Sequence, residues 1–108
     1  MPWATLCELE ELQEDVGKYV EIDALQLAVF LHDGEVHVLD NLCPHAGGSL
    51  ASGYIADGCV VCPLHDWPFR LADGQMPDSY GVGVKKFTSR LHDLPDGRRL
   101  VQVELPRR

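Results

Sequence analysis

Two short segments, each with a cysteine, a proline and a histidine, constrain this sequence more than any other feature. The first reads CPHAGGSL from residue 43, and the second reads CPLHDWPF from residue 62. One residue separates Cys43 from His45, and two residues separate Cys62 from His65. A single pair of this kind is weak evidence for a metal site. Two pairs offer four ligands, and together they favour one site held by both segments.

The rest of the sequence has the pattern of an all-β protein. Asp-Gly pairs, which favour tight turns, occur at residues 33–34, 73–74 and 96–97. Short apolar or alternating runs lie around them, and the run EVHVLD presents one mostly apolar face. These runs are YVEIDAL, QLAVFLHDGEVHVLD, CVVC, PFRLADGQ and VKKFTSRLHDLPDGRRLVQVEL. The run ELEELQED could form one short helical turn at most. With no repeat and no linker-like composition, we expect residues 1–108 to form a single domain.

The two Cys-His segments lie where the strand pattern is interrupted. Each follows a predicted strand, and the proline after each cysteine keeps the segment out of a β-ladder. Loops at the ends of neighbouring strands can converge on one site, with the sheet as a rigid base. The 16 residues between His45 and Cys62 are enough for a small hairpin out and back.

The ligand types leave two metal centres open. Thiolate and neutral imidazole both suit zinc, and thiolate also suits iron-sulfur clusters. Structural zinc sites tend to pair cysteine with cysteine and histidine with histidine, whereas each segment here offers one of each. Two mixed loops can instead clasp a 2Fe-2S cluster that has two cysteines on one iron and two histidines on the other. The residues favour this cluster, with a structural zinc-binding interaction module as the alternative.

The stretch CPHAGGSLASGYIADGCVVCPLHDWPF resembles the two cluster loops of Rieske proteins in its spacing, prolines and glycines. The loops are expected at about residues 41–70, and the strand-rich remainder fits the Rieske-type fold of stacked antiparallel sheets. The resemblance implies one 2Fe-2S cluster per chain. It assigns Cys43 and Cys62 to one iron and His45 and His65 to the other, with the free ring nitrogens of both histidines facing solvent.

Departures from this family pattern indicate the ferredoxin-like branch. High-potential Rieske proteins carry a further cysteine in each loop, and a disulfide joins these two, whereas this sequence has Gly48 and Leu64 there. Those proteins also place a serine and a tyrosine after the second histidine, where this sequence has Trp67 and Phe69. Fewer hydroxyl donors to sulfur stabilise the reduced cluster less, which implies a lower reduction potential.

Within that branch, CPHAGG followed by CPLHDW most resembles the small subunit of assimilatory NAD(P)H nitrite reductase. Members of that group often have a tryptophan two residues after the second histidine. Ferredoxins of aromatic-ring dioxygenases share the ligands but more often have glycine where this sequence has Asp66. Both assignments imply transfer of single electrons. Because no nucleotide-binding motif or substrate pocket is recognisable, we expect a carrier or subunit that is not catalytic alone and has no catalytic residues.

The charge of the chain bears on its partners. With 17 acidic and 9 basic residues, the net charge of −8 opposes binding to nucleic acid or to an anionic membrane surface. No signal peptide and no apolar window of about 18 residues is present, so we expect a cytoplasmic protein without membrane association. The four cysteines could pair as two disulfides in a secreted protein. Cytosolic thiols stay reduced, however, and two of the four have a histidine close by, which favours metal binding over disulfides.

The resemblance also implies a partner. We expect a larger redox subunit, or an oxygenase or reductase, to dock at the His45/His65 tip. Asp40, Asp57 and Asp66 are expected near this tip. Lys18 is the only basic residue before Arg70 in the sequence, so the partner's surface should be basic and partly apolar.

The remaining cysteines and histidines are expected to have structural roles. Cys7 and Cys59 match no ligand position of the family, and we interpret them as buried free thiols that pack as small apolar groups. His32, His37 and His92 are interpreted as surface or strand histidines. A Cys-His nucleophile is conceivable from residue types, but no oxyanion or substrate pocket can be recognised.

Overall fold

The computed structural model describes residues 2–44, 47–64, 66–77 and 82–105. Within these ranges it contains ten β-strands and two short 3-10 helices, and no α-helix. The strands are β1 Trp3–Glu8, β2 Lys18–Ile22, β3 Leu25–His32, β4 Glu35–Asp40, β5 Tyr54–Ala56, β6 Cys59–Val61, β7 Pro68–Arg70, β8 Lys86–Phe87, β9 Ser89–Asp93 and β10 Arg99–Glu104. The 3-10 helices are η1 Leu9–Glu11 and η2 Leu50–Ser52. This confirms the predicted all-β class and the single helical turn in ELEELQED. No helix in the described ranges is long and apolar enough to cross a membrane.

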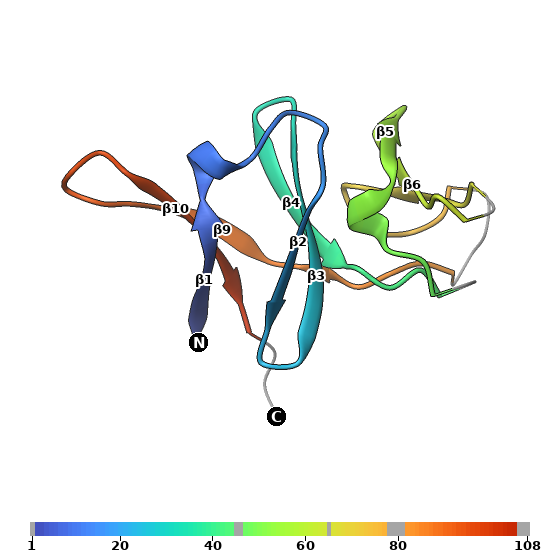
Figure 1. The fold of residues 1–108 in the computed structure, drawn as a ribbon, viewed down its shortest axis with the longest axis horizontal. Coiled ribbons are helices and arrows are strands. Elements are labelled where there is room, and N and C mark those ends of the chain that lie inside the picture. Colours follow the sequence, from blue (N-terminus) through green and yellow to red (C-terminus); the bar gives the residue numbers. More distant parts are fainter. Residues whose placement is uncertain (1, 45–46, 65, 78–81, 106–108) are drawn as a thin grey trace.

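The strands form three antiparallel sheets (Figure 1). The base sheet has the order β1-β10-β9, the central sheet β2-β3-β4-β8, and the small sheet β5-β6-β7. Figure 1 shows the β9–β10 hairpin projecting at one end of the molecule and the small sheet lying at the other, with the central sheet between them. The predicted architecture of stacked antiparallel sheets is therefore confirmed.

The central sheet is buried on both faces and separates two apolar cores. On β3, Leu27 and Val29 face one core while Ala28 and Phe30 face the other, and all four are fully buried. The base core contains the buried residues Cys7, Leu12, Leu27, Val29, Val38, Phe87, Val101 and Val103. The loop core contains Ala28, Phe30, Leu39, Cys43, Leu50, Val60, Cys62, Phe69, Leu71 and Val84.

Strand β4 shows how the two-sided burial differs from the sequence expectation. Its predicted apolar face, which includes Val36 and Val38, packs on the base core. The opposite face also becomes buried near the end of the strand, because Leu39 packs in the loop core and is fully buried. An alternating pattern predicts one buried face, but a strand covered on both sides needs apolar residues on both.

The Asp-Gly pairs form turns, as predicted. Asp33–Gly34 closes the β3–β4 hairpin with φ values of 51° and 78°, the left-handed conformation that two-residue hairpin turns require. Asp96–Gly97 lies in the β9–β10 connection. Asp73–Gly74 follows β7 in a turn across which the Arg70 N–H donates to the Gln75 carbonyl at 2.9 Å.

One turn was not predicted. The sequence predicts YVEIDAL as one short strand-like run, but it contains the turn between β2 and β3. Asp23 and Ala24 form this turn with φ values of 49° and 67°. Alanine rarely adopts positive φ, so the sequence carried no local signal for a turn here. Pairing between β2 and β3 over five residue pairs stabilises the turn despite its composition.

Candidate metal centre

Asn41 organises the first Cys-His loop. It follows β4 directly, is only 3% exposed, and is the buried polar residue of the described chain. Its side-chain oxygen accepts hydrogen bonds from the Ala51 N–H at 2.8 Å and the Ser49 hydroxyl at 3.2 Å. Its backbone carbonyl accepts from the Leu50 N–H at 2.8 Å. Asn41 thus joins the two ends of the loop, a role that sequence reasoning missed. The only signal was an asparagine between a strand and a cysteine, a common turn-forming arrangement.

Backbone hydrogen bonds also close the loop around Cys43. The Cys43 N–H donates to the Gly48 carbonyl at 2.9 Å, and the Gly47 N–H donates to the Cys43 carbonyl at 2.8 Å. Gly47 has a φ of 70°, which glycine adopts without strain. The Cys43 side chain is held inward and is 1% exposed.

The second loop connects β6 and β7 of the small sheet. The Cys62 N–H donates to the Trp67 carbonyl at 2.8 Å and closes the loop. Within it, Asp66 adopts a φ of 55°, a conformation in which glycine would be unstrained. Cys62 is fully buried.

The two loops bring Cys43 and Cys62 together, as predicted. Both side chains are buried in the loop core, and Cys43 is among the neighbours that raise the pKa of Cys62. A β-carbon placed on Gly48 would lie 3.0 Å from Cys62 Sγ, so the first loop packs its backbone against the sulfur of the second. The same β-carbon would lie 3.2 Å from Leu64 Cδ1. Positions 48 and 64, where high-potential relatives carry their disulfide, are therefore neighbours here too.

The environment of the thiols suits a cationic centre. Burial is the main cause that raises the pKa of the Cys62 thiol; the Leu64 backbone opposes this rise, and the neighbouring Cys43 thiol adds to it. Two buried thiolates side by side would repel each other without a positive charge, and ligation to iron supplies that charge. These two residues therefore fit as a pair of ligands to one metal ion. The other two predicted ligands, His45 and His65, lie outside the described residues.

Apolar side chains surround the thiols. Phe69 is fully buried, and Trp67 packs against the same core. Phe69 carries no hydroxyl that could donate to a sulfur atom. An apolar shell of this kind limits solvent access and lowers the local dielectric, two of the means by which a protein tunes a metal centre.

The surface near the loops is apolar with acidic side chains. Leu42 and Leu64, one on each loop, are 48% and 46% exposed. Asp66 on the second loop is exposed, whereas Asp40 is half-buried and its carboxylate accepts from the Leu42 N–H at 3.1 Å.

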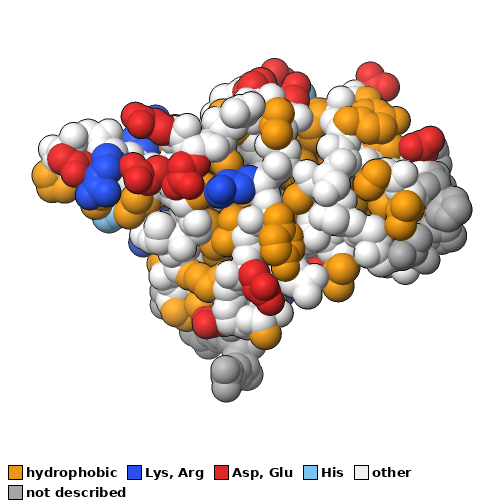
Figure 2. Space-filling view, viewed as in Figure 1, with side chains coloured by type: hydrophobic (Ala, Val, Ile, Leu, Met, Phe, Trp, Pro, Cys, Tyr) orange, Lys and Arg blue, Asp and Glu red, His pale blue; other side chains and the backbone are white. Residues whose placement is uncertain are grey.

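Asp57, which the sequence placed near this tip, lies instead in the β5–β6 turn, at the other end of β6 from the second loop. Figure 2 shows hydrophobic and acidic side chains on the visible face of the small sheet. Arg70 at the end of β7 is exposed, and its guanidinium is paired with the Asp73 carboxylate at 3.0 Å.

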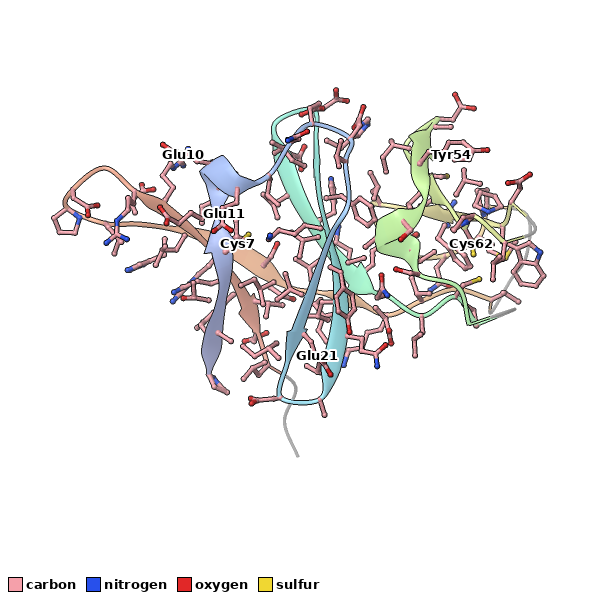
Figure 3. All side chains as sticks on the ribbon, in the orientation of Figure 1. Cys7, Glu10, Glu11, Glu21, Tyr54 and Cys62 are labelled. Atoms are coloured by element: carbon pink, nitrogen blue, oxygen red, sulfur yellow. The ribbon has the colours of Figure 1, made fainter. Side chains whose placement is uncertain are left out.

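The remaining cysteines are confirmed as buried free thiols. Cys7 and Cys59 are each 6% exposed, neither is in a disulfide, and burial raises the pKa of both. Figure 3 shows Cys7 close to η1 and Cys62 near the opposite end of the molecule. Cys7 packs in the base core, away from the two converging loops.

The histidines outside the loops are strand residues, as predicted, but two of them make specific contacts. His92 is exposed on β9. His32 Nδ1 lies 2.6 Å from the Asp15 carboxylate, and this hydrogen bond raises the pKa of His32. Glu14, Asp15 and His32 also present ligand atoms within 4.8 Å of one another. These groups already have protein partners, because Glu14 accepts from the Asp33 N–H at 2.6 Å.

Comparison with known proteins identifies the family of this chain. Residues 2–87 match the family described as the Rieske [2Fe-2S] domain. A Mycobacterium tuberculosis protein assigned as the small subunit of an NADH-dependent nitrite reductase has the same fold, with a TM-score of 0.80, 30% identity and 94% of each chain covered. A ferredoxin of Sphingomonas yanoikuyae B1 superposes with a TM-score of 0.81 at 28% identity, over 97% of this chain and 100% of the ferredoxin.

Curated relatives include both short and long proteins. The ferredoxin component of the alkene monooxygenase system of Xanthobacter autotrophicus is 26% identical over 103 residues, which is 94% of this chain and 82% of the relative. In six longer relatives, this chain corresponds to only 12% to 17% of the relative's own length. The same domain therefore occurs both as a separate small protein and as one part of larger ones.

Proposed function

We propose that this chain, which belongs to the Rieske 2Fe-2S family, is the small electron-transfer subunit of an NAD(P)H nitrite reductase. Family membership supports the general part of this function: the protein binds a 2Fe-2S cluster and transfers electrons. The assignment to nitrite reductase rests on the 30% identity to the nitrite reductase small subunit over nearly the whole length of both chains. The CPLHDW sequence of the second loop supports the same choice.

We assign Cys43 and Cys62 as the ligands of one iron and His45 and His65 as the ligands of the other. The convergence of the two buried thiols supports the cysteine half of this assignment. The histidine half rests on the resemblance alone. When bound, the cluster accepts and releases one electron at a time.

The residues of the chain set the conditions for this transfer. Gly48 lets the loops pack closely around the sulfur of Cys62. Phe69 and Leu50, both fully buried, exclude water from the side of the site that faces the loop core. A rigid, dry site changes little when its charge changes, which favours rapid electron transfer in both directions.

A larger redox subunit would dock over the loops. Ferredoxin-type Rieske proteins act together with oxygenase or reductase subunits. Leu42 and Leu64 offer an exposed apolar surface there, and Asp66 adds negative charge nearby. This combination fits a basic, partly apolar patch on the partner, and the association rate should fall as salt is added.

A second candidate function is that of a ferredoxin in an oxygenase system. The similarity to the alkene monooxygenase ferredoxin over 94% of this chain favours it, as does the structural match to the Sphingomonas ferredoxin. In that role the chain would carry electrons from a reductase to an oxygenase.

Gene deletion in the native strain distinguishes the two candidates. If the chain is a nitrite reductase subunit, the deletion should abolish growth on nitrate or nitrite as sole nitrogen source. A tagged copy should restore growth and co-purify with a larger subunit that carries flavin and sirohaem. Normal growth on nitrate, together with loss of growth on an aromatic or alkene carbon source, would overturn this assignment in favour of the oxygenase ferredoxin.

A further inference from the structure

Lys86 connects the central sheet to the small sheet. Its amine, on β8, donates one hydrogen bond to His37 Nδ1 on β4 and another to the backbone carbonyl of Leu71, both at 2.7 Å. Leu71 directly follows β7 of the small sheet and is 2% exposed. Lys86 is paired with Leu39 across β8 and β4, so its side chain lies on the face of the central sheet that carries the loop core.

This contact joins the two parts of the fold that carry the Cys-His loops. The first loop continues from the end of β4, and the second loop is the connection between β6 and β7. By holding Leu71 against β4 and β8, Lys86 sets the position of the small sheet relative to the central sheet. Leu71 also packs in the same core as Cys43 and Cys62, so a displacement of Leu71 would be transmitted to both thiols.

The short distance defines the protonation state of the pair. Two cations do not approach to 2.7 Å in a half-buried site, so the Lys86 ammonium donates and His37 Nδ1 accepts as part of a neutral ring. Burial, the charge of Lys86 and the charge of His32 lower the pKa of His37, while Glu35 and the Leu71 backbone raise it; the net direction is downward. The pKa of Lys86 is lowered by burial, against the opposing effects of Glu35 and Asp73.

We propose that Lys86 and His37 are positioning residues that set the spacing of the two cluster loops, and that protonation of His37 breaks their contact and loosens the cluster site. The inference rests on the assignment of these loops as the cluster site, and it does not depend on which partner receives the electron.

The direction of the pH effect follows from linkage. While the contact is intact, the pKa of His37 lies below its ordinary value of 6.5. When the contact opens, His37 regains that ordinary value. Opening therefore takes up a proton, and it becomes more favourable as the pH falls below about 6.5. At pH 8 the ring is neutral in both states, and the contact contributes its full stabilisation.

Loss of the cluster from holoprotein tests the positioning role. The decay of visible absorbance is followed at pH 8 with an excess of an iron chelator, for wild type, Lys86→Met and Lys85→Met. Methionine keeps most of the lysine stem but removes its charge and donors. Lys85 is the matched control, because it is exposed and its amine lies over the Phe87 ring at 4.9 Å from the centroid. We expect about tenfold faster loss in Lys86→Met, the factor for one charged hydrogen bond, and no more than about a twofold change in Lys85→Met.

The pH profile separates this role from a general loss of stability. In His37→Asn the amide oxygen can accept from Lys86 near the position of Nδ1 but cannot be protonated. The ratio of cluster-loss rates, wild type to His37→Asn, should be near one at pH 8 and rise steadily as the pH falls to 5.5, to no more than about ten. His92→Asn, which changes an exposed histidine on β9, should follow wild type throughout.

The outcomes are decisive in either direction. A rate ratio that stays constant with pH, or equal cluster loss in Lys86→Met and Lys85→Met, would overturn the proposal. If circular dichroism shows that Lys86→Met is unfolded, the His37→Asn profile decides alone. Because isolated holoprotein is used, failure here leaves the nitrite reductase assignment intact, and failure of the growth test leaves this proposal intact.

Discussion

The two sides of the central sheet contain buried cysteines in different settings. On the base side, Cys7 packs in a core formed mainly by strands that pair over long ladders. On the loop side, Cys43 and Cys62 come from two separate loops and meet in one core. All three are at most 6% exposed. Burial therefore does not distinguish a ligand from a packing residue, whereas the meeting of two thiols from different loops does.

The two cores also differ in how closely backbone atoms approach the cysteine sulfur atoms. Most side chains of the base core come from regular strands. The loop core includes backbone that approaches a sulfur atom closely, as at Gly48. Changes on the loop side should affect the cluster before they affect the fold, and changes on the base side should affect only the fold.

The largest expected effect is the loss of a ligand. Cys43→Ser or Cys62→Ser should abolish the visible colour, whereas Cys7→Ser and Cys59→Ser should keep it, because the last two thiols only pack. Iron and acid-labile sulfide should each be about two per chain in wild-type protein purified without oxygen. Stoichiometric zinc without sulfide would contradict the cluster, and colour loss confined to Cys7→Ser or Cys59→Ser would show that the ligands are misassigned.

The next prediction compares two equally buried leucines, one in each core. Leu27→Ala on the base side and Leu39→Ala on the loop side remove equally buried side chains from adjacent strands. Each should lower the free energy of unfolding by about 2–5 kcal/mol. In urea, cluster absorbance should be lost before the circular dichroism signal only in Leu39→Ala. If the urea concentrations at which absorbance and circular dichroism are lost differ equally in the two variants, the loop core has no special effect on the cluster.

A smaller effect is expected from two glycines. Gly48→Ala places a methyl group 3.0 Å from Cys62 Sγ, so the sulfur or the loop must move, at about 1–3 kcal/mol. Its visible and electron paramagnetic resonance spectra should change. Gly58→Ala meets no atom within 4 Å, but its φ of 74° is strained for alanine, at about 1 kcal/mol. That variant should lose stability with unchanged spectra. Identical spectra for both would show that position 48 does not restrain the sulfur.

The reduction potential should respond to one phenylalanine and not to another. In Phe69→Tyr the added hydroxyl enters the loop core, where a hydrogen bond to sulfur would favour the reduced cluster. A bond of about 1 kcal/mol would raise the potential by on the order of 40 mV. Phe87→Tyr, in the base core, should leave the potential unchanged. Voltammetry that finds equal shifts in the two variants would argue against selective tuning from the loop core.

The smallest effect concerns the exposed histidine pair. The hydrogen bond with Asp15 raises the pKa of His32, so its stabilisation is fully present below about pH 6.5 and disappears as the pH rises through the raised pKa. Asp15→Asn should therefore reduce stability more at pH 6 than at pH 9, by less than about 0.5 kcal/mol because both groups are solvent-accessible. This sign is opposite to that expected for His37. Urea denaturation at the two pH values measures it, and a larger loss at pH 9 would refute the assignment.

The local pattern of the sequence determined much of this protein. Alternating apolar runs and Asp-Gly pairs predict an all-β chain, and two turns such as Asp33–Gly34 occur in hairpin connections as expected. The paired Cys-His segments predict a shared metal centre, and the structure brings Cys43 and Cys62 together. These features are readable because strand periodicity, turn geometry and ligand chemistry act over a few residues.

Only the tertiary structure decided the rest. The turn at Asp23–Ala24 has no local signal and depends on the pairing of β2 with β3. The burial of both faces of β3 depends on the sheets above and below it. Lys86 and His37 are 49 positions apart, and no periodicity relates them. Such contacts depend on which distant segments the folded chain packs together, and the free energy of that packing belongs to the whole molecule and not to any short stretch of sequence.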